Sequence, residues 1–460
     1  MPELNQVSWQ QLDASHHLHP FTDSRALQQK GARVIERGEG VYLWDSQGQR
    51  ILDGMAGLWC VNLGYGRQEL IEAAHQQLQQ LPYYNLFFQT THPPAARLAA
   101  TLAGILPGNM QHVFFTGSGS ECNDTVVRMV RHFWAQQGQP KRQVIISRKN
   151  AYHGSTLAGA SLGGMKPMHA QGGLPLPDMV HIDQPYYFAE GQGMTPHEFG
   201  LERAGQLEQK ILELGPERIA AFIGEPIQGA GGVIIPPASY WPEIQRICKK
   251  YDILLVVDEV ICGFGRTGHW FASEYYGLEP DLLCMAKGIT SGYIPLGAVA
   301  VGERVAHTLI AGGEFFHGYT YSGHPVACAV AQANIEVMQQ EHIIERVRDD
   351  IGPYLQQRWA SLASHPLVGE TRGLGLVAAL ELVADKATQA RYSESAGAGM
   401  ICREHSLEMG LVMRAVGDTM IISPPLVITH QQVDELIDKA RQALDLTLST
   451  LNNRQGKHHD

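Results

Sequence analysis

The sequence predicts an α/β protein in which a large domain, built on a mainly parallel sheet flanked by helices, is joined to a smaller α+β domain. The first observation is that residues 110–300 alternate short, continuously apolar runs with longer amphipathic stretches, the pattern of βαβ units. The second is that long amphipathic stretches replace this pattern after about residue 330. The third is the length of 460 residues, which exceeds what one hydrophobic core usually organises.

The predicted sheet takes its strands from short apolar runs rich in β-forming residues. Because these runs do not alternate apolar and polar side chains, we expect both faces of each strand to be covered, as in a parallel sheet. The runs are 112–115, 144–146, 219–223, 253–257 and 282–286. Residues 202–214 and 241–251 carry apolar side chains at three- and four-residue spacing, which predicts crossover helices.

The regions on either side of this pattern complete the predicted domain organisation. Residues 40–44 and 51–53 are expected to pair as strands through the polar turn between them. A helix over 329–340 and a strand over 373–382, opened by glycines, are expected in the smaller domain. The predicted boundaries are 1–65 for an N-terminal segment that packs with the small domain and a dimer interface, 66–328 for the large domain and 329–460 for the small domain.

Composition and charge exclude several classes of function. The formal net charge is −11 at pH 7, from 35 basic and 46 acidic side chains, so we expect no nucleic-acid partner. No stretch approaches the length of a membrane span and the N-terminus lacks a signal-peptide pattern, which predicts no membrane partner. The seven cysteines are scattered and never spaced C-x-x-C, as expected for reduced thiols in the cytoplasm.

The residues that follow the predicted strands are the candidates for chemistry, because ligands of an open α/β sheet bind beyond the carboxyl ends of its strands. Ser118, Gly119 and Ser120 follow the first run and precede a helical pattern. A glycine–serine turn at a helix N-terminus offers backbone N–H groups and hydroxyls to an anion, which suits a phosphate. A simple polar turn is the alternative.

Two charged positions follow later strands. Asp258 and Glu259 end the run at 253–257, and alternation along a strand lets only one of them face a site there. Alone, such a pair is more typical of a metal ligand or a helix cap than of a carboxylate that pairs with a pyridine nitrogen. Lys287 follows the run at 282–286 beside Gly288. Desolvation there would lower the pKa of Lys287 and make its amine nucleophilic enough for a Schiff base, whereas a surface lysine is the alternative.

Two further patterns are interpreted as structural. Residues 263–268 match G-x-G-x-x-G after a strand, the fingerprint of nicotinamide dinucleotide sites. No long apolar helix follows these glycines, so we expect a loop that lines the site and no NAD(P). The histidines within 16–19 and 457–460 lack a supporting carboxylate or cysteine pattern. We therefore expect surface histidines there and no metal site.

Several of these motifs together resemble the cofactor-attachment signature of class III aminotransferases, which depend on pyridoxal 5′-phosphate (PLP). The resemblance lies in Asp258-Glu259-Val260, the glycine-rich residues 263–268, Pro280-Asp281 and Ala286-Lys287-Gly288, and it extends over nearly the whole chain, from Gly54 to Ala415. It implies PLP fold type I and a homodimer with active sites at the subunit interface. Whether dimers pair into tetramers stays open.

The resemblance also implies a role for individual residues. Lys287 would hold PLP as a Schiff base and move a proton, and Asp258 would pair with the pyridine nitrogen. Tyr152 would stack on the ring, and Glu225 would lie near its hydroxyl group. The implied cofactor site is completed by Ser118, Gly119 and Ser120 at the phosphate, Thr320 of the partner subunit, His153 and Val260. Ala151 and Cys122 depart from the family's usual glycine and alanine, and each would add bulk near the cofactor.

Within the family, residues 413–426 resemble putrescine and polyamine:pyruvate aminotransferases. This implies ping-pong transfer of a terminal amino group from putrescine, a polyamine, an ω-amino acid or an aryl-alkylamine to pyruvate. Arg414 would bind the keto-acid carboxylate as a bidentate pair. The amine pocket is expected from Phe21, Trp59, Phe87, Phe88 and Tyr152, with core packing as the alternative for each. An aminomutase, racemase or decarboxylase on the same fold is the alternative function.

Overall fold

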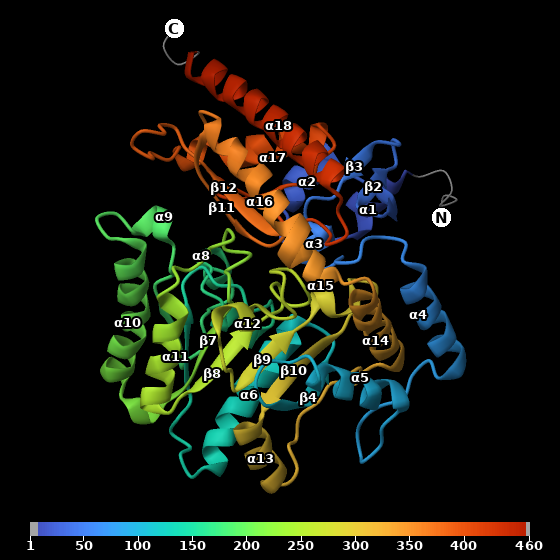
Figure 1. Ribbon diagram of the computed structural model, residues 1–460, viewed down its shortest axis with the longest axis vertical. Helices are drawn as coiled ribbons and strands as arrows, with labels where there is room; N and C mark the ends of the chain where they lie inside the picture. Colours follow the sequence, from blue (N-terminus) through green and yellow to red (C-terminus); the bar gives the residue numbers. More distant parts are fainter. Residues whose placement is uncertain (1–7, 457–460) are drawn as a thin grey trace.

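A seven-stranded sheet with helices on both faces forms the centre of the protein, of which a computed structural model describes residues 8–456 (Figure 1). Its strands are β4 (Met110–Thr116), β5 (Val144–Arg148), β6 (Met179–Ile182), β7 (Ile219–Gly224), β8 (Leu254–Asp258), β9 (Leu282–Met285) and β10 (Gly297–Gly302). The spatial order is β4-β10-β9-β8-β7-β5-β6, and β10 pairs antiparallel with both neighbours. The other pairs are parallel, which confirms the predicted mainly parallel sheet.

Burial on both faces explains the continuous apolar runs of the central strands. Every residue of β7, β8 and β9 is buried. In β5, Ile145 packs into the apolar cluster that contains Val126 and Val130 of α6 (Gly119–Gln136). Val144 packs on the opposite side, in the cluster that contains residues of α10 (Pro196–Leu214) and α11 (Tyr240–Tyr251). Period-2 alternation therefore sends successive apolar side chains into two different cores.

Shorter helices surround the sheet and connect it to the small domain. The remaining helices of the large domain are α4 (Gln68–Gln80), α5 (Pro93–Ala103), α7 (Leu157–Leu162), α8 (Lys166–His169), α9 (Tyr187–Glu190), α12 (Ala272–Tyr276) and α13 (Glu303–Ala311). The chain then passes through α14 (Pro325–Gln340) and α15 (Ile343–Arg346). The small-domain helices are α16 (Gly352–Ala360), α17 (Ala398–Glu408) and α18 (His430–Gly456).

The small domain contains a four-stranded antiparallel sheet. Its strands are β11 (Val368–Leu374), β12 (Val377–Leu382), β13 (Arg414–Val416) and β14 (Thr419–Ile422), in the order β11-β12-β14-β13. The prediction of one strand over 373–382 is wrong, because the chain turns at Gly375 between β11 and β12. Gly375 has φ +57°, and a Cβ there would lie 2.5 Å from the backbone oxygen of Arg266. Only glycine fits this tight turn.

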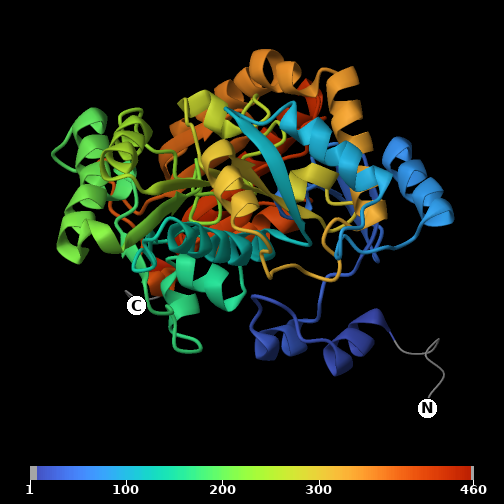
Figure 2. The ribbon, with the colours of Figure 1, turned by 90° about the horizontal axis from the view of Figure 1, so that it is seen from below.

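The N-terminal segment forms a small sheet and an extended arm. The strands β1 (Ile35–Glu39), β2 (Tyr42–Asp45) and β3 (Arg50–Leu52) pair antiparallel, followed by the short α3 (Ala56–Trp59). Backbone bonds from Leu52 to Gly410 and Val412 tie β3 to the small domain. The arm, with α1 (Trp9–His16) and α2 (Ser24–Lys30), extends beyond the body of the molecule (Figure 2). The domain boundaries at residues 65 and 328 stay a prediction.

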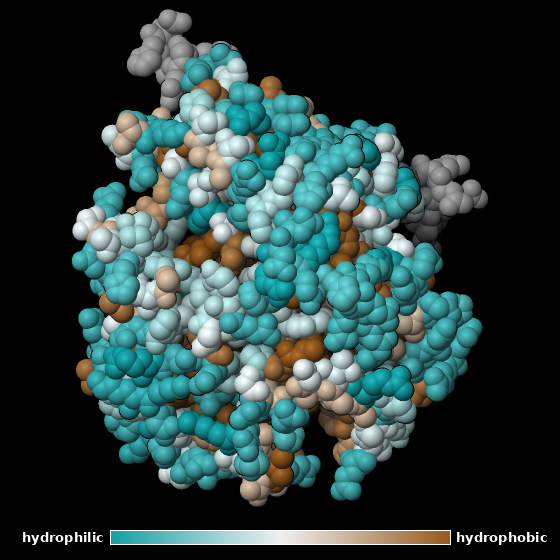
Figure 3. All heavy atoms as spheres, viewed as in Figure 1, coloured by the Kyte–Doolittle hydropathy of each residue, from teal (hydrophilic) through white to brown (hydrophobic). Residues whose placement is uncertain are grey.

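The surface is mostly polar. Figure 3 shows a largely hydrophilic face on which apolar side chains gather in hollows near its centre. Among the helices within residues 8–456, none combines the length and the apolar character that a membrane span requires.

Candidate active site

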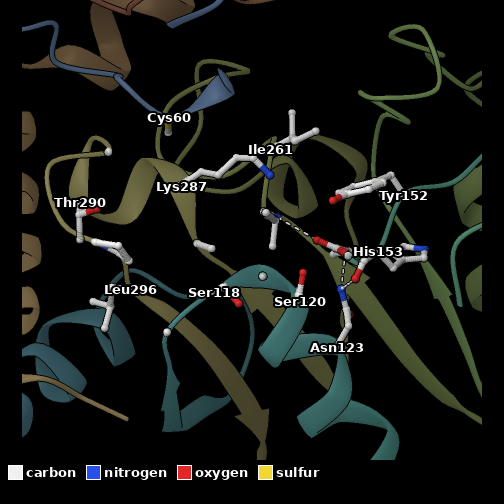
Figure 4. A pocket seen from close by; sticks show the side chains of 18 of the residues that line it. Cys60, Ser118, Ser120, Asn123, Tyr152, His153, Ile261, Lys287, Thr290 and Leu296 are labelled. Atoms are coloured by element: carbon white, nitrogen blue, oxygen red, sulfur yellow. Dashed lines mark hydrogen bonds and ion pairs between the residues drawn. The ribbon is translucent and has the colours of Figure 1, made fainter. Parts of the chain in front are cut away.

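A cavity of about 320 Å³ opens beyond the carboxyl ends of the sheet strands. Its walls come from the residues that follow β4, β5, β7, β8 and β9, so distant parts of the sequence meet at one edge of the sheet. Figure 4 shows Lys287, Tyr152 and His153 around it, above Ser118 and Ser120. The structure thus brings most of the predicted cofactor residues together, with Asp258, Glu225, Val260 and Gly119 also in the walls.

One end of the cavity is a helix N-terminus built to receive an anion. Ser118 is the N-cap of α6, and its Oγ accepts a hydrogen bond from Glu121 N at 3.2 Å. The first-turn N–H groups of the 18-residue helix point to this end. Glycine lets the backbone close around it: a Cβ on Gly154, at φ +125°, would lie 2.7 Å from Ser120 Cα, and one on Gly119 would lie 3.0 Å from Val260 Cγ1. This cradle suits a phosphate group.

An ionised carboxylate lies deeper in the cavity. Asp258 is 3% exposed, and its Oδ2 lies 2.8 Å from His153 Nδ1 and 2.9 Å from Asn123 Nδ2. Burial alone would raise the pKa of Asp258, but the hydrogen bonds from His153 and Asn123 and the charge of His153 hold it below its usual value. Glu259 points away and accepts bonds from Ala272 N and Ser273. Alternation along β8 therefore directs Asp258, and not Glu259, into the cavity.

The lysine of the cavity sits in a strained backbone position. Lys287 follows β9 and begins a 3₁₀ turn with φ +47°, a left-handed conformation that costs about 1–2 kcal/mol for a residue with a Cβ. Burial lowers the pKa of its ammonium group, so the neutral, nucleophilic amine is more available than in water. Its side chain extends into the cavity toward Tyr152 (Figure 4).

A second carboxyl group holds the loop that carries the aromatic wall. Glu225 accepts bonds from Tyr152 N and Gly229 N, each at 3.0 Å, and burial raises the pKa of this carboxyl. Arg148 lies behind it, fully buried, and donates to the Glu225 backbone oxygen. The Arg148 guanidinium also lies 5.3 Å from the ring centre of Trp241.

The protein family follows from the similarity of this chain to known proteins. The family description Aminotransferase class-III matches residues 25–444. The chain belongs to the class III aminotransferases. It is 62% identical over 443 residues to a putrescine–pyruvate aminotransferase of Pseudomonas aeruginosa, covering 96% of this chain and 97% of that protein. It is also 41% identical over 453 residues to a diaminobutyrate–2-oxoglutarate transaminase of Halomonas elongata, covering 96% and 95%.

Solved structures agree with this assignment. The ω-transaminase of Pseudomonas jessenii in complex with PMP is 43% identical, has a TM-score of 0.94, and covers 97% of this chain and 99% of its own. The protein is therefore a PLP-dependent aminotransferase with PLP fold type I. The cavity fits the cofactor: the α6 N-terminus suits the phosphate, Asp258 suits a protonated ring nitrogen, and Lys287 suits the aldehyde carbon.

Several residues in this aminotransferase site were missed from the sequence. Asn123 is a buried polar residue on the apolar face of α6, and its position three residues after Ser120 was an available signal. Cys60 and Thr290 also line the cavity. No local pattern marks Arg148, which is a buried cation at the end of β5.

The expected substrate residues are more dispersed than the cofactor residues. Among the described residues, the walls of the 320 Å³ cavity do not include Phe21, Trp59, Phe87, Phe88 or Arg414. Phe21 lies near the mouth: its ring centre is 6.3 Å from the centre of the Tyr152 ring, and the two rings are inclined at 65°. Trp59 is 2% exposed and packs with Met55 and Ile227, as the core alternative predicts. Arg414, at the start of β13, is half-buried, and burial lowers the pKa of its guanidinium.

Thr320 lies outside this cavity in the same chain. It lines a neighbouring cavity of about 780 Å³ together with Gly117 and Glu121, and Tyr83 Oη donates to its backbone oxygen at 2.6 Å. Phe88 is 90% exposed. Both positions are therefore open to contact from outside the chain.

The glycine-rich residues 263–268 do not line the cavity, so the expectation that they do is wrong. A Cβ on Gly265 would lie 2.8 Å from Leu426 Cδ1, and one on Gly268 would lie 2.7 Å from Arg348 Cα. These glycines let the loop pack against the small domain. Arg266 in the same loop is fully buried and donates to backbone oxygens of Leu376 and Pro424, which ties the two domains together.

The two departures from the family pattern also lie outside the cavity walls among the described residues. Cys122 is a buried residue of α6, with Sγ 3.1 Å from Thr116 Oγ1. Ala151 is fully buried beside Tyr152. Their added bulk is therefore accommodated in the protein interior behind the cavity.

Proposed function

We propose that this aminotransferase moves the terminal amino group of putrescine or a related amine to pyruvate, giving an aminoaldehyde and alanine by a ping-pong mechanism. The observation that carries the proposal is the 62% identity, over nearly the full length of both chains, to the putrescine–pyruvate aminotransferase of Pseudomonas aeruginosa. Polyamines, ω-amino acids and aryl-alkylamines are the other donors that we propose.

The residues that line the cavity have different roles in the proposed reaction. When bound, PLP supplies an electron sink for negative charge that develops at the substrate carbon. The α6 N-terminus binds its phosphate, and the Tyr152 ring offers a flat wall for its ring. The Asp258 carboxylate would favour a proton on the ring nitrogen of the bound cofactor. Lys287 Nζ, with its lowered pKa, would accept a proton from the substrate carbon and then donate it to the carbon that keeps the amino group.

Two substrates of different charge use the same cavity in turn. The amine has no carboxylate at its reacting end, whereas pyruvate has one beside its ketone. Arg414 supplies a half-buried cation for that carboxylate. Phe21, at the Tyr152 edge, contributes apolar surface for the amine's carbon chain. We propose that Phe87 and Phe88 of the partner subunit also line the pocket for the amine.

We also propose a homodimer whose subunits complete each other's sites, with pairing into tetramers left open. Thr320 of the partner subunit would then join the phosphate end of the cavity. Supporting this, Thr320 lines the cavity that adjoins Gly117, and large exposed side chains surround it, with Tyr321 66% and Phe316 76% exposed. Exposed apolar groups of this size mark subunit interfaces. We place the enzyme in the cytoplasm, which suits its seven free cysteines.

A substrate panel tests the proposal. The PLP-loaded enzyme is assayed for alanine formation from pyruvate with putrescine, cadaverine, spermidine, β-alanine and an aryl-alkylamine. We expect the highest kcat/KM with putrescine. The matched control replaces pyruvate by 2-oxoglutarate. Faster formation of glutamate than of alanine with every donor would show that the acceptor is wrong.

A further inference from the structure

The N-terminal arm contains a group of metal-ligating side chains outside the active site. Asp13 and His17 lie one helical turn apart at the end of α1, and His17 Nδ1 is 3.0 Å from Asp13 Oδ1. The chain then turns, so that His19 Nε2 lies 2.8 Å from Asp13 Oδ2. The ligand atoms of all three residues lie within 4.8 Å of one another. The expectation that these histidines lack a supporting carboxylate is therefore wrong.

We propose that Asp13, His17 and His19 bind a divalent transition-metal ion of the zinc class. Two imidazoles and one carboxylate are ligands that zinc, nickel, copper and cobalt prefer, whereas calcium and magnesium prefer oxygen alone. Ligand atoms about 2.1 Å from one tetrahedral ion lie about 3.4 Å apart. The two His–Asp separations, 3.0 and 2.8 Å, need only a small opening to reach that value, and all the ligand atoms already lie within 4.8 Å of one another.

The exposure of the group leaves room for the remaining ligands. The side chains of Asp13, His19 and His17 are 21%, 24% and 59% exposed. Three protein ligands on one side with solvent on the other form an open site in which water completes the coordination. The ion would replace the hydrogen bonds that the two histidines now make to the Asp13 carboxylate.

The arm has little else to hold its fold. Neither α1, of eight residues, nor α2, of seven, has a buried side chain, and isolated helices of this length are marginal in water. Figure 2 shows both helices beyond the body of the molecule. Small elements without a core are often stabilised by a metal ion, because binding favours the folded arrangement of the ligands. The ion would fasten the end of α1 to the segment that follows it.

This segment leads directly to the active-site mouth. Phe21 follows His19 by two residues, has φ +47°, and places its ring edge against Tyr152. An ion on His19 would therefore fix the segment that presents Phe21 to the amine. This consequence, unlike the metal site itself, rests on the proposed function.

Calorimetry on the full chain tests the site. The PLP-loaded enzyme, without a tag, is treated with a chelator and desalted to remove free PLP, then titrated with Zn²⁺ in the absence of amine. We expect one ion per chain at the arm. Asp13→Asn, His17→Gln and His19→Gln should each weaken binding by at least about tenfold, while circular dichroism shows an unchanged fold.

Two controls separate this site from other histidines. His16→Gln changes the exposed neighbour, and a His458→Gln, His459→Gln double variant changes the C-terminal cluster, which lies outside the described residues. Both should bind Zn²⁺ like the parent. The proposal is overturned if the parent does not bind Zn²⁺ below about 1 mM, or if Asp13→Asn and His17→Gln bind as tightly as the parent.

The link to Phe21 has its own measurement. Zn²⁺ should lower KM for an aryl-alkylamine at least about twofold in the parent, with kcat unchanged, and leave KM unchanged in His17→Gln. Equal KM values with and without Zn²⁺ in the parent would refute the link. Failure of the proposed function would appear instead as absence of amine transfer to pyruvate, with the calorimetry unaffected.

Discussion

At the residue scale, burial affects the pKa values of three groups in the cavity in different ways. Burial lowers the pKa of Lys287 and raises that of Glu225, because each favours its neutral form away from water. Asp258 is equally buried, but its hydrogen bonds to His153 and Asn123 outweigh desolvation and keep it ionised. The cavity therefore places a nucleophilic amine and an anion in the same buried site, which is what a protonated pyridine ring and its aldehyde require.

Lys287 is predicted to be the residue that holds the cofactor covalently. Lys287→Ala should abolish turnover, because no other lysine lines the cavity among the described residues. The variant should also lose the visible absorption band of the covalently bound cofactor and the label that borohydride fixes in the parent. Mass spectrometry of a borohydride-reduced digest checks the result. A reducible bond that persists in Lys287→Ala would assign the cofactor to another lysine.

Asp258 is predicted to act on rate more than on cofactor affinity. Asp258→Asn keeps the size of the side chain but removes the charge that holds a proton on the ring nitrogen. We expect PLP still to bind while kcat falls by about a hundredfold or more, the effect of removing one preorganised electrostatic group. A fall of less than about threefold, under 1 kcal/mol of barrier, would remove Asp258 from the mechanism.

Arg414 should separate the two half-reactions. Removing a charge-assisted pair costs about 2–5 kcal/mol when its partner is left buried. Arg414→Ala should therefore slow reaction of the aminated enzyme with pyruvate by at least about tenfold, while the reaction of the PLP form with putrescine changes little. Stopped-flow absorbance follows each half alone. Equal slowing of both halves would mean that Arg414 supports the fold or the cofactor.

At the scale of elements, the N-terminus of α6 combines a structural and a binding task in one side chain. Ser118 caps the helix through Glu121 N, and Thr195 caps the distant α10 through Glu198 N. Ser118→Ala and Thr195→Ala should each lower the apparent free energy of unfolding of the PLP-free protein by about 1 kcal/mol. Only Ser118→Ala should also raise the Kd for PLP, by about tenfold, as measured by fluorescence titration. Equal PLP affinity in both variants would exclude Ser118 from phosphate binding.

Elements with strong local patterns were the ones that the sequence predicted well. The runs that became β7, β8 and β9 are apolar throughout because both of their faces are covered. β10 was not predicted, since its Gly-Ala-Val-Ala-Val-Gly sequence has small side chains and its antiparallel pairing depends on distant partners. The break between β11 and β12 also depends on a distant partner, the Arg266 carbonyl that excludes a Cβ at Gly375.

The same distinction applies to the candidate site. Asp258 and Lys287 could be predicted because they end apolar strands, and strand ends meet at one edge of a parallel sheet. Arg148 and Asn123 could not be assigned a task, because their partners Glu225 and Asp258 lie 77 and 135 residues away. The carboxylate of Asp13 was overlooked although its partners are near in sequence, because only the turn after α1 brings His19 back to it.

At the scale of the whole molecule, two arginines with little or no exposure join the two domains. Arg372 of β11 donates to the backbone oxygens of Gly232 and Val233 in the large domain and pairs with the buried Glu381 of β12. Arg266 makes the opposite connection, from the large domain to Pro424. Glu225 and Gly232 both lie in the segment between β7 and α11, so the Arg372 hydrogen bonds attach the small domain to the segment that carries a cavity residue.

We expect two chains of this protein to complete each other's active sites. We expect light scattering to give a particle mass of at least about twice the 50.6 kDa chain, and we expect two inactive variants to restore each other. A Lys287→Ala chain lacks the lysine but keeps its own Thr320. A Thr320→Asp chain keeps Lys287, but its added carboxylate would repel the phosphate bound at the neighbouring site. In a mixed dimer, the site with Lys287 receives an intact Thr320 of the partner subunit.

Differently tagged chains, purified as mixed dimers, should therefore show about half of the parent kcat per dimer, since one site of two is complete. If Thr320 served its own chain, the mixed dimers would be as inactive as either variant alone.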